Sequence, residues 1–165
     1  MISRKRIIPD PGQESVWDYP RPPRLEAIGE KIVVVFTDVK IAESVRAYRV
    51  LETSHPPNYY IPPEDVRMDH LVKGTGTSLC EWKGQARYYD VVDGQKRSRS
   101  AAWFYDNPTV EFREIRRFVA FYAGRVDACY VDGEKVTPQP GGFYGGWITS
   151  RIVGPFKGVA GSSFW

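Results

Sequence analysis

The chain has few of the residues that build metal sites and covalent cross-links. Its 165 residues include two cysteines and two histidines. Cys80 and Cys129 lie far apart, and neither belongs to a CxxC or CxxH pair. The sequence therefore predicts no zinc site and no disulfide framework, and we predict no metal and no cofactor. Both thiols are expected to be reduced and buried, and redox chemistry at Cys80 is the less favoured alternative.

Long apolar runs are also absent. The longest aliphatic run, 32–36, is far shorter than the roughly 20 residues that cross a bilayer. The basic start of the chain is followed by Pro9, Asp10 and Pro11 in place of the apolar stretch of a secretory signal. We therefore expect a cytoplasmic protein that has no membrane partner.

The net charge of +3 is unevenly distributed. Residues 1–24 carry +2 of it, and the rest of the chain carries +1. A nucleic-acid-binding protein usually gathers its positive charge on one face of the folded domain. The distribution therefore argues against a nucleic-acid partner.

Proline and glycine divide the chain into three parts of one domain. Residues 1–24 contain five prolines, which disrupt helices and sheet ladders, so we predict an extended N-terminal lead-in. Trp17 and Tyr19 are expected to anchor the lead-in on the domain. Residues 25–137 form the predicted core domain. Residues 138–165 are rich in glycine and aromatic residues and are expected to wrap around that same domain.

Turn signals between apolar segments predict antiparallel hairpins. Thr37-Asp38, Asp93-Gly94 and Asp132-Gly133 each separate two such segments, and Asp-Gly readily adopts the positive φ angles of a tight hairpin turn. Helix is expected at 109–117, with Asn107 as its N-cap, and a single helical turn is expected at 62–66. The pattern predicts a mainly β fold with one or two short helices.

The proline-rich segment 51–65 is the first candidate site. A strand delivers Glu52, and four prolines restrict the backbone that follows, so His55, Tyr59 and Tyr60 are held in defined positions. Polar groups held beside aromatic rings are what a small-molecule site requires. The alternative is a structural corner whose tyrosines cap the core, and the sequence leaves both interpretations open.

Trp82 and Lys83 form a second candidate. An indole wall beside a cation suits an anionic or planar ligand. The alternative is a core tryptophan with a solvated lysine neighbour. Asp127 stands in a valine-rich segment, where a buried acid needs a partner, and Lys83 or Arg46 could supply one. A solvated Asp127 is equally compatible with the pattern.

These segments resemble a known family. The motifs at 46–57, 59–62, 82–84, 102–103, 121–122 and 126–127 are similar to those of domain-of-unknown-function family 427. The glycine-rich and aromatic segments 141–149 and 154–158 resemble the tail of its longer members. The resemblance extends from about Val16 to Trp165.

The resemblance implies a β-tent, in which two antiparallel sheets lean together over an aromatic pocket. This fold is similar to that of methionine sulfoxide reductase B, the guanine-nucleotide-exchange chaperone group and the cereblon ligand-binding domain. Many of those relatives hold zinc through two CxxC pairs, which this sequence lacks. What the resemblance implies here is a pocket walled by Tyr60, Trp82, Trp103 and Tyr122.

The family has also been labelled nucleotidyltransferase-like. Such enzymes place a Gly-Ser pair before paired aspartates that hold magnesium. The only Gly-Ser pair of this chain is Gly161-Ser162, and no acidic residue follows it. The sequence therefore does not support that activity.

A binding module is the leading functional hypothesis. It would hold a small planar or charged metabolite between the four aromatic walls. Arg46, Glu52, Lys83 and Asp127 would then set the polarity of the pocket.

Two alternatives come from other classes. In a cofactor-free enzyme, Glu52 or Asp127 would act as base, His55 or Tyr60 as acid, and Lys83 would stabilise developing negative charge. In a structural protein, residues 138–165 would mediate self-association into a homo-oligomer.

Overall fold

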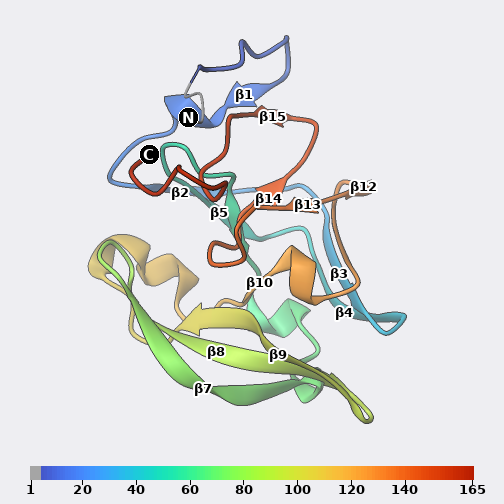
Figure 1. Ribbon diagram of the computed structural model, residues 1–165. Coiled ribbons are helices and arrows are strands. Elements are labelled where there is room, and N and C mark those ends of the chain that lie inside the picture. Colours follow the sequence, from blue (N-terminus) through green and yellow to red (C-terminus); the bar gives the residue numbers. More distant parts are fainter. Residues whose placement is uncertain (1–4) are drawn as a thin grey trace.

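The computed structural model describes residues 5–165 and shows a mainly β protein (Figure 1). The prediction of a mainly β fold built from antiparallel sheets is confirmed. Residues 1–4 of the predicted lead-in lie outside the described residues.

The strands are β1 (Glu14–Ser15), β2 (Arg24–Ala27), β3 (Ile32–Phe36), β4 (Val39–Ser44), β5 (Tyr48–Leu51), β6 (Asn58–Tyr60), β7 (Leu71–Cys80), β8 (Gly84–Asp93), β9 (Lys96–Tyr105), β10 (Ala120–Phe121), β11 (Ala128–Val131), β12 (Glu134–Lys135), β13 (Thr137–Pro138), β14 (Trp147–Ile148) and β15 (Ile152–Val153). The 3₁₀ helices are η1 (Val16–Asp18), η2 (Pro63–Asp65), η3 (Met68–His70), η4 (Val110–Ile115) and η5 (Ala123–Arg125).

The longest strands form one four-stranded antiparallel sheet in the order β10-β9-β8-β7. It lies at the base of Figure 1, opposite β1 and β15. The hairpin predicted around Asp93-Gly94 is present, but Asp93 pairs with Lys96. The turn therefore consists of Gly94 and Gln95, one residue later than predicted.

A second four-stranded antiparallel sheet has the order β12-β11-β3-β4. Both of its predicted hairpin turns are confirmed. Thr37 and Asp38 have φ angles of 50° and 65°, and Asp132 and Gly133 have φ angles of 47° and 82°. Two successive positive φ angles match the right-handed twist of the flanking strands, which is why these dipeptides fix the register.

A three-stranded antiparallel sheet has the order β2-β5-β6. Residues 52–57, the first part of the proline-rich segment, connect β5 to β6, and Asn58 lies opposite Val50. The terminal segments pair with each other, because β1 runs parallel to β15. β1 and β15 accordingly lie side by side in Figure 1.

The buried side chains form a main core and an aromatic cluster. The main core contains the inward residues of β3, such as Ile32 and Val34, together with Trp147 from the C-terminal segment. Trp147 stacks on Tyr59 with ring centroids 4.9 Å apart, and its Nε1 donates to the carbonyl oxygen of Phe121 at 2.9 Å. The aromatic cluster contains Tyr60, Trp103, Tyr105, Phe112 and Ile115 among its buried members.

The helix predicted at 109–117 is shorter and less regular than expected. The structure has the 3₁₀ helix η4, whose N-cap is Thr109 and not Asn107. Phe112 departs from helical geometry with φ −117° and ψ 17°. Both Phe112 and Ile115 are buried in the aromatic cluster, so tertiary packing overrides the local helical pattern. No helix within residues 5–165 is long and apolar enough to cross a membrane.

Candidate ligand cavity

A cavity of about 320 Å³ opens between the long sheet, the proline-rich segment and the C-terminal segment. Its volume lies at the lower end of the range of small-molecule sites. It is lined by Val50, Glu52, His55, Pro56, Asn58, Tyr60, Ser78, Leu79, Cys80, Glu81, Trp82, Lys83, Ala86, Tyr88, Trp103, Tyr105, Tyr122, Phe143, Tyr144, Gly145 and Lys157.

Aromatic rings make up much of the wall. Trp103 and Tyr105 are two residues apart on β9, so both side chains point to the same face of the sheet. Trp103 Nε1 donates to the hydroxyl of Tyr60 at 3.2 Å, and the Trp103 ring lies 4.6 Å from that of Tyr122. Burial raises the pKa of Tyr60 and also raises that of Tyr122 to about 12, so both phenols are neutral at physiological pH.

Lys83 is the most unusual polar group of the cavity. It lies in the turn between β7 and β8, and only 5% of the residue is exposed to solvent. Its Nζ lies 5.9 Å from the ring centroids of Tyr105 and Phe112. Within the part of the chain that the structure describes, Lys83 forms no ion pair with a carboxylate.

Several opposing effects determine the protonation of Lys83. Burial, the largest effect, disfavours the ammonium, whereas the oxygen of the neutral Tyr60 phenol, the sulfur of Cys80 and the carboxylate of Glu52 favour it. Together these neighbours outweigh burial and raise the pKa of Lys83. The cavity therefore contains a charged ammonium surrounded mainly by rings.

His55 is fixed as a neutral imidazole by Gln139. The Gln139 amide is oriented because its Oε1 accepts from the Gly146 N–H at 3.0 Å and its Nε2 donates to the Lys157 carbonyl oxygen at 2.8 Å. The same Nε2 lies 3.2 Å from His55 Nδ1, which must then be the acceptor. Burial and the nearby Lys157, Arg21 and Lys83 charges lower the pKa of His55 to about 3.

The proton of the neutral His55 is therefore on Nε2. This nitrogen lies 3.8 Å from Glu52 Oε2, which also forms an ion pair of 3.4 Å with Arg21. His55 is consequently suited to donate a hydrogen bond and poorly suited to accept a proton. Glu52 is the remaining candidate base among the buried or half-buried carboxylates of the cavity.

Asn58 contributes an acceptor without a partner. Its Oδ1 is buried and has no hydrogen-bond partner within the described residues. An unsatisfied buried carbonyl oxygen costs about 1–3 kcal/mol, so such atoms are rare in proteins. Asn58 is the first residue of β6 and lines the cavity.

The C-terminal segment closes one side of the cavity through Phe143, Tyr144, Gly145 and Lys157. A Cβ atom on Gly145 would lie 2.2 Å from the Trp103 ring, so only glycine permits this close approach. The Tyr122 hydroxyl donates to the Phe143 carbonyl oxygen at 3.1 Å. The C-terminal segment is therefore held directly against the aromatic cluster.

The structure brings most of the predicted site residues together. The cavity is lined by Glu52, His55, Tyr60, Trp82, Lys83, Trp103 and Tyr122. Arg46 and Asp127 do not line it. Arg46 forms a bidentate pair with Asp65 on the surface, with bonds of 2.8 and 2.9 Å. Asp127 accepts a hydrogen bond from the Thr37 backbone N–H in the β3–β4 turn, so neither Lys83 nor Arg46 is its partner.

Sequence reasoning missed several lining residues. Tyr105 could have been found, because it follows Trp103 by two positions in the same alternating strand. Asn58, Tyr144 and Lys157 gave no comparable signal. Their positions depend on how distant segments fold back onto the sheet.

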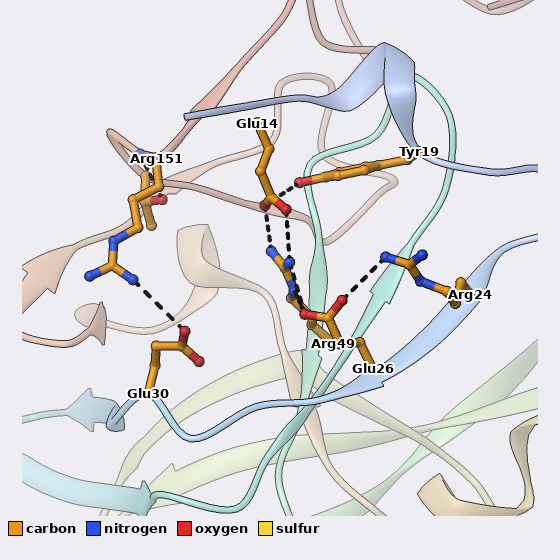
Figure 2. Close-up of polar contacts among 8 residues, drawn as sticks. Glu14, Tyr19, Arg24, Glu26, Glu30, Arg49 and Arg151 are labelled. Carbon is orange, nitrogen blue, oxygen red and sulfur yellow. Dashed lines mark hydrogen bonds and ion pairs between the residues drawn. The ribbon is translucent and has the colours of Figure 1, made fainter. Parts of the chain in front are cut away.

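A second cavity, of about 400 Å³, differs in having its charges paired. Figure 2 shows Arg49 between the carboxylates of Glu14 and Glu26, with bonds of 2.8 and 3.1 Å to Glu14 and 2.9 Å to Glu26. Arg151 lies 3.8 Å from Glu30 at the other side of this cavity. Because its charged groups already have partners, this cavity is the weaker candidate for a ligand site.

Comparison with known families adds one result. Residues 24–132 match a family described as a domain of unknown function (DUF427). The chain belongs to this family. No curated protein matches the chain. The DUF427 region includes the strands that carry Tyr60, Trp103 and Tyr105, whereas Phe143, Tyr144 and Lys157 come from beyond its end.

Proposed function

We propose that this protein is a small-molecule-binding module whose ligand occupies the cavity around Lys83. One observation carries the proposal: a nearly buried ammonium faces a cavity of about 320 Å³ without a carboxylate partner among the described residues. A buried charge usually has a counter-charge supplied by the protein or by a ligand. The aromatic walls would hold the apolar part of that ligand.

The proposal is tested by filling the cavity. Ser78 lines the cavity from β7, whereas the preceding residue, Thr77, does not and is exposed. Adjacent residues of a strand point to opposite faces, so Ser78→Trp should fill the cavity and Thr77→Trp is the matched control.

The measurement is a thermal-shift screen with aromatic acids, nucleotides, sulfoxides and quaternary amines. A ligand present at 100 times its Kd should add about 2.7 kcal/mol of stability to the native chain and to Thr77→Trp. The Ser78→Trp variant should lose this gain. The proposal would be contradicted by a compound that stabilises all three proteins equally. It would also be contradicted if no compound of the four classes stabilises the native chain.

A second candidate function is a cofactor-free enzyme that uses the same cavity. The observation that favours it is the 3.8 Å approach of Glu52 Oε2 to His55 Nε2 inside the cavity. Glu52 would act as base, Tyr60 as acid, and Lys83 would stabilise negative charge on the substrate. For this function, Glu52→Gln should abolish turnover of a cavity ligand while retaining its binding. If no cavity ligand is chemically altered by the native protein, binding alone is the function.

A further inference from the structure

The charges that face the cavity indicate the charge of its ligand. Lys83 and Lys157 both line the cavity, and Lys83 forms no ion pair within the described part of the chain. Lys157 Nζ donates to a main-chain oxygen of Trp165, the last residue of the printed sequence, at 3.2 Å. Of the two lining acids, Glu52 is paired with Arg21, and Glu81 is exposed. The interior of the cavity therefore has an excess of positive charge.

This excess disfavours a cationic ligand despite the aromatic walls. Rings alone would attract a cation, but two ammonium groups in the same small space repel one. Polyphosphates are disfavoured for a different reason, because among residues 5–165 two cations line the cavity and Glu52 lies beside them. A single negative charge is the best match.

The unpaired Asn58 Oδ1 indicates a second property. A carbonyl oxygen accepts hydrogen bonds and cannot donate them. Less than 1 Å² of this oxygen is accessible, so a ligand O–H or N–H group would reach it once the Asn58 amide turns toward the cavity that the residue lines, and would then satisfy an acceptor that has no partner among residues 5–165. The flat surfaces of Trp103, Tyr105 and Tyr60 favour a planar ring between the two polar ends.

We infer that the ligand is a small aromatic monocarboxylic acid with a hydroxyl or N–H donor on its ring. Its carboxylate would be held by Lys83, with Lys157 as the second cation. Its donor would bind Asn58 Oδ1. This inference rests on the proposed function and specifies the ligand class of that same cavity.

The first test compares ligands that differ only in charge. One series is 4-hydroxyphenylacetate, 4-hydroxyphenylacetamide and tyramine, and the other is indole-3-acetate, indole-3-acetamide and tryptamine. Titration calorimetry with the full chain at neutral pH should show at least one acid binding about 10-fold or more tightly than its amide and amine. This test uses the unmodified protein, so it does not depend on how any variant folds.

The second test assigns the charge preference to Lys83. In Lys83→Met the preferred acid should lose about 10-fold in affinity, while its amide changes by less than about 2-fold. Lys157→Met should cause a smaller loss for the acid. Lys135→Met removes an exposed lysine that does not line the cavity, and it should bind like the native protein.

The third test concerns Asn58. The affinity advantage of 4-hydroxyphenylacetate over phenylacetate, or of indole-3-acetate over naphthalene-1-acetate, should disappear in Asn58→Leu. Failure of both acids to bind at up to about 10 mM, or equal binding of acid, amide and amine, overturns the inferred ligand class. If an amide or amine binds and Ser78→Trp abolishes that binding, the proposed function stands while this inference fails.

Discussion

Two buried cations of this protein have opposite surroundings. Arg49, whose side chain is 15% exposed, is bonded to both Glu14 and Glu26 (Figure 2). Lys83 is even more buried and has no carboxylate partner within the described residues. Burial disfavours both charges, but at Arg49 the hydrogen bonds to the two carboxylates outweigh it and raise the pKa further.

The difference separates a structural role from a binding role. The Arg49 network joins β1 of the lead-in to β2 and β5, so it is complete within the protein. Lys83 is buried at the wall of a cavity, and no carboxylate among the described residues forms an ion pair with it. Removing each cation should therefore have different consequences.

The largest loss of stability is expected for Arg49→Met. This substitution removes the Arg49 partner of Glu14 and Glu26 and one of the links between the lead-in and the core, where buried Val16 and Tyr19 still hold the lead-in. Because both acids are partly exposed, the free energy of unfolding should fall by about 2–4 kcal/mol, somewhat less than for a fully buried pair. Urea denaturation measures this change. Arg46→Met is the control, since its pair with Asp65 is exposed and should contribute much less; equal losses would show that the Arg49 network is not special.

A smaller loss is expected for Gly145→Ala at the cavity wall. The new Cβ would contact the Trp103 ring, so the C-terminal segment must move, at a cost of about 1–3 kcal/mol. Urea denaturation also measures this change. Gly29→Ala is the matched control, because a Cβ there meets no atom within 4 Å. If both variants are equally stable, the close approach of Gly145 to the Trp103 ring does not fix the position of the C-terminal segment.

The pH dependence of stability tests His55. Its pKa is about 3 in the fold, compared with an ordinary value of 6.5. The unfolded chain therefore binds a proton that the folded chain does not, and stability falls as the pH decreases from 6.5 toward 3. The slope due to this group approaches about 1.4 kcal/mol per pH unit.

Denaturation curves measured across this pH interval would isolate the effect. The His55→Gln variant should lose stability less steeply than the native protein as the pH decreases. His70→Gln, which removes the other histidine of the chain, is the control. An unchanged slope in His55→Gln would show that the buried imidazole does not resist protonation.

The smallest change in stability is expected for Lys83→Met. An apolar side chain of similar length replaces a buried charge, and such replacements are often neutral or stabilising. The free energy of unfolding should remain within about 1 kcal/mol of the native value. A loss as large as that of Arg49→Met would show that Lys83 supports the fold, and the comparison between the two cations would no longer hold.

Local chemistry explains which parts of the fold could be predicted. Thr37-Asp38 and Asp132-Gly133 adopt positive φ angles at both turn residues, so these hairpins follow from short-range preferences. The segment 109–117 was predicted less well, because burial of Phe112 and Ile115 decides its conformation. At Asp93-Gly94 the strands were predicted correctly and the turn was placed one residue too early.

The candidate site, like the fold, could be predicted from the sequence only in part. Tyr60, Trp82 and Trp103 were selected for their aromatic character, and the fold places all three at one cavity. Asp127 was selected as an acid in an apolar strand, but a backbone N–H of the neighbouring turn is its partner. A pattern along the chain could not identify that partner, since Thr37 is distant in sequence.

The sequence by itself determined the hairpins at Thr37-Asp38 and Asp132-Gly133 and the supply of aromatic and charged side chains, because these depend on the preferences of each residue and its immediate neighbours. Only the tertiary structure decided which cation is paired. The positions of β1 and β2 beside β5 place Arg49 between two carboxylates, and β9 and η4 place Lys83 among rings. The charge environment of a side chain depends on distant segments, and so it emerges only when the chain is folded.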